Sequence, residues 1–290
     1  MAAPVSVPNR LEPIAAREDC PVCASPSLRE YCEVPSRFRE GETIRYSRCA
    51  RCELVFRNPA PPPVARLQAY EDVEIRPGRT RLQAKKQRHY RFMLRELKRH
   101  AHGESLHLLD FGSGAGGLLV AGREAGFEVT GLEVQRAMAA WVAENRGVRV
   151  LAETIDGPGL AGETFDCITS TQVFEHLVDP RATLQSLLPK LRPGGLLLTE
   201  VPNLLDFREV RRRGSTMDDS HLFYFSAASL SQMLRAEGLE IVCVREGLRP
   251  WGWLGAAAEF VPLALLHTAE RLSARVGLRT GLSVVARRPA

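Results

Sequence analysis

Residues 106–118 read LHLLDFGSGAGGL, and this stretch decides the fold. Its first four residues are mostly apolar and predict a buried strand. The turn that follows carries three alternate glycines, Gly112, Gly114 and Gly116. Glycine lets a backbone turn sharply and approach a ligand closely, and a helix beginning at Leu118 would place its N-terminus, which favours negative charge, beside that turn. The stretch therefore predicts a strand, a ligand-binding turn and a helix.

Strands and helices alternate beyond this point. The predicted strands are Leu106–Asp110, Glu128–Glu133, Val148–Leu151, Phe165–Ser170, Gly195–Val201, Leu239–Arg245 and Leu282–Ala286. The predicted helices between them are Leu118–Glu124, Arg136–Asn145, Pro180–Leu191 and Ser226–Glu237. Apolar strands alternating with helices indicate right-handed βαβ units. We expect an α/β, Rossmann-like fold: a seven-stranded, mostly parallel sheet with helices on both faces.

Acidic residues end the first two of these strands. Asp110 precedes the first glycine of the turn, and Glu133 follows about 20 residues later, where a ribose diol is bound in such folds. A dinucleotide-binding turn has the spacing G-x-G-x-x-G, whereas this turn reads G-x-G-x-G. The pattern therefore favours a nucleoside-containing cofactor other than a dinucleotide.

With the later segments 165–180 and 191–198, this pattern resembles the class I S-adenosylmethionine-dependent methyltransferases from about Leu106 to Asn203. In that family the acidic Gly-rich motif cradles the methionine and ribose moieties, and the acid ending the second strand binds the ribose hydroxyls. The resemblance implies S-adenosyl-L-methionine as cofactor, with Thr154 placed near adenine by position alone. The implied cofactor-binding residues are Asp110, Gly112, Gly114, Gly116, Glu133 and Thr154.

Four of the seven cysteines form two C-x-x-C pairs, Cys20 with Cys23 and Cys49 with Cys52. Four thiolates so spaced can close a tetrahedral zinc site, and the metal would supply folding energy that this segment, poor in apolar residues, lacks. We expect structural Zn²⁺ rather than a redox pair, because both pairs lie outside any βαβ unit. The other three cysteines, Cys32, Cys167 and Cys243, are interpreted as small core residues.

The chain divides into four predicted parts. Residues 1–16 form a flexible N-terminus, 17–58 a small N-terminal zinc ribbon, 59–103 a linker with a basic helix over Thr80–His100, and 104–290 the methyltransferase domain. Within that domain we expect a lid at about 202–225 and an apolar insertion at about 250–276. No signal-like N-terminus and no long uninterrupted apolar run occurs, so we expect a soluble, cytoplasmic protein.

A zinc ribbon followed by a methyltransferase domain is similar to a bacterial group associated with sugar and secondary-metabolite methylation. Sugar C-methyltransferases of this kind carry a further C-terminal domain, and the sequence ends before one. We therefore expect transfer to a hydroxyl of a small molecule, a sugar nucleotide or secondary-metabolite intermediate, with transfer to nitrogen or carbon as alternatives.

Two histidines are the candidate catalytic residues. His176 follows the fourth strand of the domain, at the sheet edge where the methyl group should point, and Glu175 and Asp179 lie beside it in sequence. His221 is the second candidate, although Asp218 and Ser220 stand where sugar C-methyltransferases have tyrosine and glutamate. A neutral histidine suits removal of a hydroxyl proton. The alternative is a histidine that only braces the next helix.

Charge and hydropathy leave further alternatives open. Residues 1–100 carry 20 Lys and Arg against 12 Asp and Glu, so the ribbon and basic helix are also compatible with RNA methylation. Few aromatic residues of the ribbon, Tyr31, Phe38 and Tyr46, are available to stack bases, which weighs against nucleic acid. A third alternative is a non-catalytic cofactor-binding module.

Two segments suggest how a substrate or partner is held. An arginine cluster, Arg208, Arg211, Arg212 and Arg213, is a candidate clamp for a phosphorylated or nucleotide-linked substrate, or else a solvated loop. The apolar segment Trp251–Leu266 is a candidate for packing on the core, for a homodimer contact, or for contact with a membrane surface.

Overall fold

The computed structural model describes residues 15–36, 41–61, 77–103, 105–203, 220–247 and 281–290. The arginine cluster and the apolar segment 251–266 lie outside these residues. In the described part, no helix has both the length and the apolar character needed to cross a bilayer.

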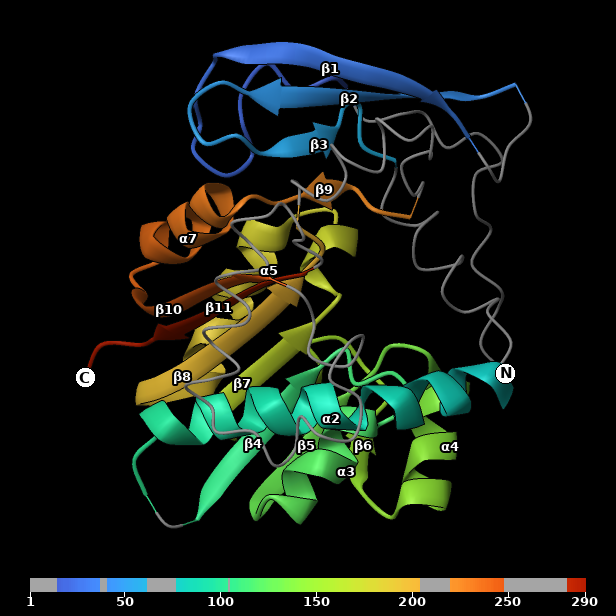
Figure 1. Ribbon diagram of the computed structural model, residues 1–290, viewed down its shortest axis with the longest axis vertical. Coiled ribbons are helices and arrows are strands. Elements are labelled where there is room, and N and C mark those ends of the chain that lie inside the picture. Colours follow the sequence, from blue (N-terminus) through green and yellow to red (C-terminus); the bar gives the residue numbers. More distant parts are fainter. Residues whose placement is uncertain (1–14, 37–40, 62–76, 104, 204–219, 248–280) are drawn as a thin grey trace.

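A seven-stranded sheet forms the larger layer of the molecule (Figure 1). Its strands, in spatial order, are β10 (Glu240–Gly247), β11 (Gly281–Arg287), β8 (Leu191–Val201), β7 (Phe165–Thr171), β4 (Leu106–Phe111), β5 (Phe127–Leu132) and β6 (Arg149–Leu151). Strand β11 is antiparallel to both β10 and β8, whereas the pairings from β8 to β6 are parallel. This confirms the predicted Rossmann-like fold and all seven predicted strands.

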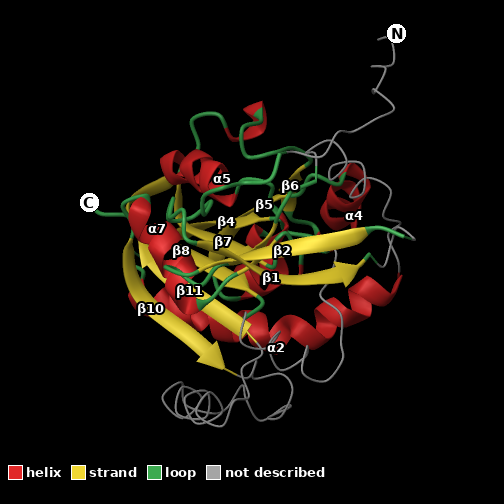
Figure 2. Cartoon of the chain, turned by 90° about the horizontal axis from the view of Figure 1, so that it is seen from above, coloured by secondary structure: helices red, strands yellow, loops and turns green. Residues whose placement is uncertain are grey.

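Helices cover both faces of this sheet (Figure 2). They are α2 (Pro77–His100), α3 (Gly117–Glu124), α4 (Arg136–Arg146), α5 (Pro180–Leu187) and α7 (Ala227–Ala236), with 3-10 turns η1 (Pro158–Leu160), η2 (Phe174–His176) and η3 (Leu188–Lys190). Leu108 belongs to the buried cluster that includes residues of α2 and α3, whereas its neighbour Leu109 belongs to the cluster that includes residues of α5 and α7. Because successive strand residues point to opposite faces, the apolar strands fill two cores at once.

The basic helix α2 begins at Pro77, three residues before the predicted start. Its buried face includes Tyr90, Met93 and Leu97, which pack onto the sheet. On its outer side, Arg91 forms a salt bridge with Glu124 of α3, and Lys98 donates a hydrogen bond to the Ala125 carbonyl. Part of the positive charge of this helix is therefore used within the fold.

A second, smaller sheet lies across the carboxyl ends of the parallel strands (Figure 1). Its order is β1 (Leu28–Pro35), β2 (Thr43–Cys49), β3 (Val55–Arg57) and β9 (Phe223–Tyr224), and all its pairings are antiparallel. The first three strands belong to the ribbon, but β9 belongs to the larger domain and follows β8 in the sequence. The ribbon is therefore joined to the larger domain by backbone hydrogen bonds.

The two parts also share one hydrophobic core. Leu54 and Phe56 of the ribbon belong to the same buried cluster as Phe174 and Leu222 of the larger domain. Tyr46 is 1% exposed, so the expectation that its ring is available to stack bases is wrong. Its ring packs against Tyr224 of β9, which comes from a distant part of the chain.

Candidate active site and metal-binding cluster

The three glycines of the turn after β4 differ in what surrounds them. All three have positive φ angles, 77° for Gly112, 51° for Gly114 and 71° for Gly116. A Cβ atom on Gly112 would lie 2.4 Å from Val173 Cγ2, and one on Gly116 would lie 2.5 Å from Val142 Cγ1. A Cβ atom on Gly114 would meet nothing within 4 Å. Gly112 and Gly116 thus permit close packing, and Gly114 borders the open side of the turn.

Glu133 fixes the open side of this turn. Its Oε2 accepts a hydrogen bond from the Gly114 amide at 2.8 Å, and its Oε1 accepts one from the Gln135 amide at 2.9 Å. Its own amide donates to the Leu151 carbonyl at 3.0 Å. That bond brings the end of β6, and the exposed Thr154 just after it, to the same sheet edge. Each carboxylate oxygen retains a lone pair that can accept from a diol.

Asp110 lies beneath the turn and is 2% exposed. Burial is the main cause that raises the pKa of its carboxyl from 3.8 to about 7; the nearby Glu133 raises it further, and a hydrogen bond from Thr169 opposes the rise. The Thr169 hydroxyl donates that bond to Asp110 Oδ1 at 2.8 Å. A buried carboxyl with a raised pKa gains most from a cationic group placed beside it.

A cluster of three side chains lies beside the glycine turn, because the loop after β7 that packs on Gly112 through Val173 continues into Glu175 and His176. The ligand-type atoms of Glu175, His176 and His221 all lie within 4.8 Å of one another. The two imidazole rings have centroids 4.7 Å apart, and His176 Nε2 lies 4.0 Å from Glu175 Oε1. The structure therefore brings the two predicted histidines together.

The backbone fixes the tautomer of His176. Its Nδ1 lies 2.8 Å from the carbonyl oxygen of Ser220, and since a carbonyl only accepts, Nδ1 must carry the hydrogen. In the neutral ring, Nε2 then carries a lone pair that can bind a proton or a metal ion. Glu175 is 0% exposed, so its carboxylate, with Oε1 4.0 Å from His176 Nε2, is shielded from bulk water.

The segment that carries His221 is held between this loop and the ribbon. The Leu222 amide donates to the Glu175 carbonyl at 2.7 Å, and the Leu222 carbonyl accepts from the Arg57 amide at 2.8 Å. Tyr46 donates its hydroxyl hydrogen to the His221 carbonyl at 3.3 Å. The position of His221 therefore depends on ribbon strands β2 and β3.

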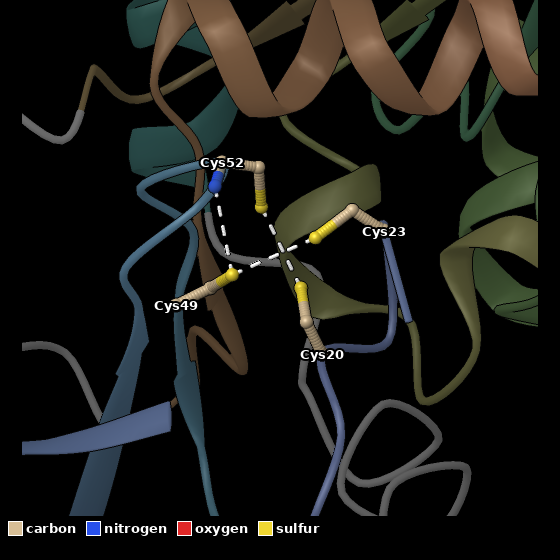
Figure 3. Close-up of side chains that lie close together, drawn as sticks. All are labelled: Cys20, Cys23, Cys49 and Cys52. Atoms are coloured by element: carbon tan, nitrogen blue, oxygen red, sulfur yellow. Dashed lines mark hydrogen bonds between the residues drawn. The ribbon is translucent and has the colours of Figure 1, made fainter. Parts of the chain in front are cut away.

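The four cysteines predicted to bind metal converge at one point (Figure 3). The Sγ atoms are 3.5 Å apart for Cys20 and Cys52 and 3.6 Å apart for Cys23 and Cys49. A tetrahedral zinc ion with bonds of about 2.3 Å separates its sulfurs by about 3.8 Å, so the donor set and spacing fit Zn²⁺. The hydrogen bond between Cys20 and Cys52 lowers the pKa of Cys20 to about 5 and raises the pKa of Cys52, so one thiol hydrogen is shared by this pair and would be released when a metal binds.

Three residues near the site have a part in it that the sequence did not predict. Glu175 was noted only as a neighbour of His176, although its full burial makes it the most constrained member of the cluster. Gln172 adopts a left-handed backbone (φ 59°), and its buried Nε2 has no hydrogen-bond partner among the described residues. Tyr46 contacts the His221 segment from across the chain. No local sequence signal identifies such contacts.

Comparison with known proteins assigns the larger domain to a family. A family model described as "Methyltransferase domain" matches residues 83–244, which is more than half of the chain. The chain belongs to this methyltransferase family. The expected class I, S-adenosylmethionine-dependent methyltransferase domain is thereby confirmed.

Curated relatives of this family member include carbon- and oxygen-methylating enzymes. It is 30% identical over 142 residues to the C-methyltransferase NovU of Streptomyces niveus, a match covering 47% of this chain and 33% of NovU. It is 32% identical over 106 residues to a ubiquinone biosynthesis O-methyltransferase of Parvibaculum lavamentivorans, covering 34% of this chain and 42% of that protein. The matches thus span less than half of either relative.

A solved structure supports the fold. The magnesium protoporphyrin IX methyltransferase of Synechocystis PCC 6803, solved with bound SAH, superposes with a TM-score of 0.52 at 13% identity. The match covers 78% of this chain and 94% of that one. At this identity the likeness concerns the fold alone.

Proposed function

We propose that this protein transfers the methyl group of S-adenosyl-L-methionine to a hydroxyl group of a small molecule. The observation that carries the proposal is the contact between the glycine turn and the histidine loop: Val173 packs against Gly112, two and three residues before Glu175 and His176. A cofactor cradle and a cluster able to activate a hydroxyl are thus neighbours at one edge of the sheet, where ligands bind in such folds.

The residues of the cradle suit this cofactor. Gly114 offers open space at the turn, Glu133 presents both carboxylate oxygens, and Thr154 lies at the end of the neighbouring strand. We assign the ribose hydroxyls to Glu133 and the adenine side to Thr154. Asp110, with Gly112 and Gly116, supports the turn from below, where its buried carboxyl favours the cationic methionine end of the cofactor.

The histidine cluster would activate the acceptor. The bound cofactor supplies an electrophilic methyl group, so the protein must align the hydroxyl and promote loss of its proton. The His176 Nε2 lone pair, fixed by the hydrogen bond to Ser220, faces the Glu175 carboxylate and the His221 ring. Gln172, with its buried amide donor, is a candidate to orient the acceptor.

We further propose that the four clustered cysteines hold a structural Zn²⁺. The ion would cross-link the two C-x-x-C turns of a segment that has little core of its own. Since ribbon strand β3 pairs with β9, the metal would also stabilise the segment that carries His221.

For the acceptor we propose a sugar nucleotide or secondary-metabolite intermediate, in keeping with the family resemblance and with relatives that methylate carbon or oxygen. RNA is the second candidate, because α2 carries an outer row of basic side chains that includes the exposed Arg95 and Arg99. The arginine clamp, the membrane-surface contact, the homodimer and the cytoplasmic location stay predictions.

Transfer of a labelled methyl group tests the proposal. Purified protein and trideuteromethyl-labelled cofactor are incubated with an extract of the source organism, which is then separated into small molecules, lipids and RNA. We expect label in small molecules as a methyl ether. Label in RNA would replace the proposed acceptor, and cofactor binding without transfer would indicate a binding module.

Variants then assign the chemistry. His176→Ala and His221→Ala should each lower turnover by about 10²-fold or more while leaving cofactor affinity unchanged. His107→Ala is the matched control, since His107 is a surface residue paired with Glu128. Turnover equal to the control in both variants would contradict a role for the two histidines.

A further inference from the structure

We infer that Glu175, His176 and His221 form a binding site for a divalent transition-metal ion, distinct from the cysteine cluster, and that this ion holds the acceptor hydroxyl. The inference rests on the proposed methyl transfer to a hydroxyl and specifies how that hydroxyl is activated. Its basis is a convergence of one carboxylate and two imidazoles whose ligand atoms lie within 4.8 Å of one another.

The surroundings of His176 and Glu175 favour a metal. His176 donates its Nδ1 hydrogen to a backbone carbonyl, the arrangement that orients metal-binding histidines and leaves Nε2 as the ligand atom. Glu175 is completely buried beside the two imidazole rings, and a cation held among the three side chains would offset the cost of burying its carboxylate. A proton on His176 Nε2 would stabilise the Glu175 carboxylate less well, because Nε2 and Glu175 Oε1 are 4.0 Å apart, beyond hydrogen-bond distance.

The backbone around these ligands is preorganised. Besides the bond to His176, the Ser220–Leu222 segment is tied to η2 by the 2.7 Å hydrogen bond from the Leu222 amide to the Glu175 carbonyl. On its other side it is tied to the ribbon through Arg57 and Tyr46. Ligands from two segments about 45 residues apart are therefore held in one place by backbone contacts, as metal sites require.

The ligand set indicates the kind of ion. Two imidazoles and one carboxylate suit Mn²⁺, Fe²⁺, Co²⁺ or Zn²⁺ rather than Mg²⁺ or Ca²⁺, which prefer all-oxygen sites. Three protein ligands leave coordination positions open for substrate. An acceptor with a second oxygen beside the reacting hydroxyl, such as a vicinal diol or an α-hydroxyketone, would bind through both oxygens.

The chemistry balances without a further reactant. Coordination lowers the pKa of the acceptor hydroxyl, which loses its proton to solvent. The alkoxide oxygen then forms a bond to the methyl carbon as the carbon–sulfur bond breaks, and the sulfur keeps the electron pair. The products are the methyl ether and S-adenosylhomocysteine.

Titration with Mn²⁺ tests the site, with free ion measured by electron paramagnetic resonance on full-length protein whose cysteine cluster is loaded with zinc. Mn²⁺ prefers oxygen and nitrogen to thiolate ligands, so the cluster does not compete. We expect one Mn²⁺ per chain. Glu175→Gln should weaken binding at least about tenfold, and so should His221→Phe, which retains a ring against Tyr224 and His176 but has no ligand atom.

His107→Gln, which alters an exposed His–Glu pair elsewhere, should bind Mn²⁺ like the wild type. Equal binding by His221→Phe and His107→Gln, or no binding by the wild type at millimolar Mn²⁺, would overturn the inference. Cofactor-induced thermal shifts show that each variant is folded.

The binding experiment also separates this inference from the proposed function. Methyl transfer is measured after treatment with a chelator that leaves one zinc ion per chain. If transfer continues there but is lost in the histidine variants, the inferred metal site is wrong and the proposed function stands. If Mn²⁺ binds to Glu175, His176 and His221 but no hydroxyl is methylated, the inferred metal site stands and the proposed function is wrong.

Discussion

Replacing Cys49 by serine should lower turnover strongly without weakening cofactor binding. The variant removes one of four thiolates, and loss of the metal would release ribbon strands β2 and β3 from the segment that carries His221. The glycine turn is not in contact with the ribbon through any hydrogen bond of the described residues, so the cofactor side should be preserved.

The size of the effect follows from the contacts that the ribbon makes with residues 221–224. Two ring pairs join them, Tyr46 with Tyr224 at 5.6 Å and Phe56 with Phe223 at 6.4 Å, and each such pair contributes about 1 kcal/mol. The hydrogen bonds to the His221 and Leu222 carbonyls contribute about 1 kcal/mol each. Loss of all four, on the order of 4 kcal/mol, would reduce the population of the ordered segment by up to about 10³-fold.

The assay compares kcat, cofactor Kd and zinc content for Cys49→Ser and for Cys32→Ser. Cys32 is a buried cysteine of ribbon strand β1 outside the four-cysteine cluster, so it controls for loss of a buried thiol in the same sheet. We expect kcat to fall by about 10² to 10³ in Cys49→Ser alone, with Kd unchanged in both. Zinc-free Cys49→Ser protein that turns over within twofold of the control would refute the coupling.

Three further outcomes follow from single contacts. Gly114→Ala should weaken cofactor binding with a small loss of stability, whereas Gly112→Ala, whose methyl group would collide with Val173, should destabilise the fold by about 2 kcal/mol or more in urea unfolding. Burial raises the pKa of the Asp110 carboxyl in the folded protein to about 7, whereas in the unfolded chain it is near 4. The free energy of unfolding should therefore fall by about 4 kcal/mol as the pH rises from about 4 through 7, because the unfolded chain releases this proton first. Asp110→Asn should therefore be more stable than the wild type at pH 8, with a smaller difference at pH 5; a difference that does not change with pH would show that the carboxyl is not the cause. Tyr46→Phe, which removes only the hydroxyl, should lower kcat about two- to fivefold with unchanged cofactor Kd, and an effect on Kd instead would contradict its role through His221.

The larger sheet could be predicted because its signals are local. Each strand is a short apolar run bounded by turn residues, and the glycines at 112, 114 and 116 stand where the backbone has positive φ. Helix α5 began where expected, since Asp179 caps it and Pro180 opens it, but it ended earlier than predicted because residues 188–190 form a 3-10 turn. The sequence therefore predicted whether each element is a helix or a strand, but it predicted the end residues less accurately.

The pairing of β9 with the ribbon could not be predicted. Residues 222–225 read LFYF, and the continuous apolar run indicates burial on both sides without indicating a partner. The partner, β3, lies more than 160 residues earlier in the sequence. The burial of Tyr46 has the same cause, because its neighbour Tyr224 belongs to that distant strand.

This difference separates the two halves of the candidate site. The cofactor half is built from residues at the ends of neighbouring parallel strands, where sequence order and spatial order agree, so Asp110, Gly114 and Glu133 could be named in advance. The acceptor half needs η2, the His221 segment and the ribbon together. Among the described residues, hydrogen bonds join the ribbon to the acceptor half and none joins it to the cofactor turn. Metal loss should therefore change which acceptors are methylated, or how fast, before it changes cofactor affinity.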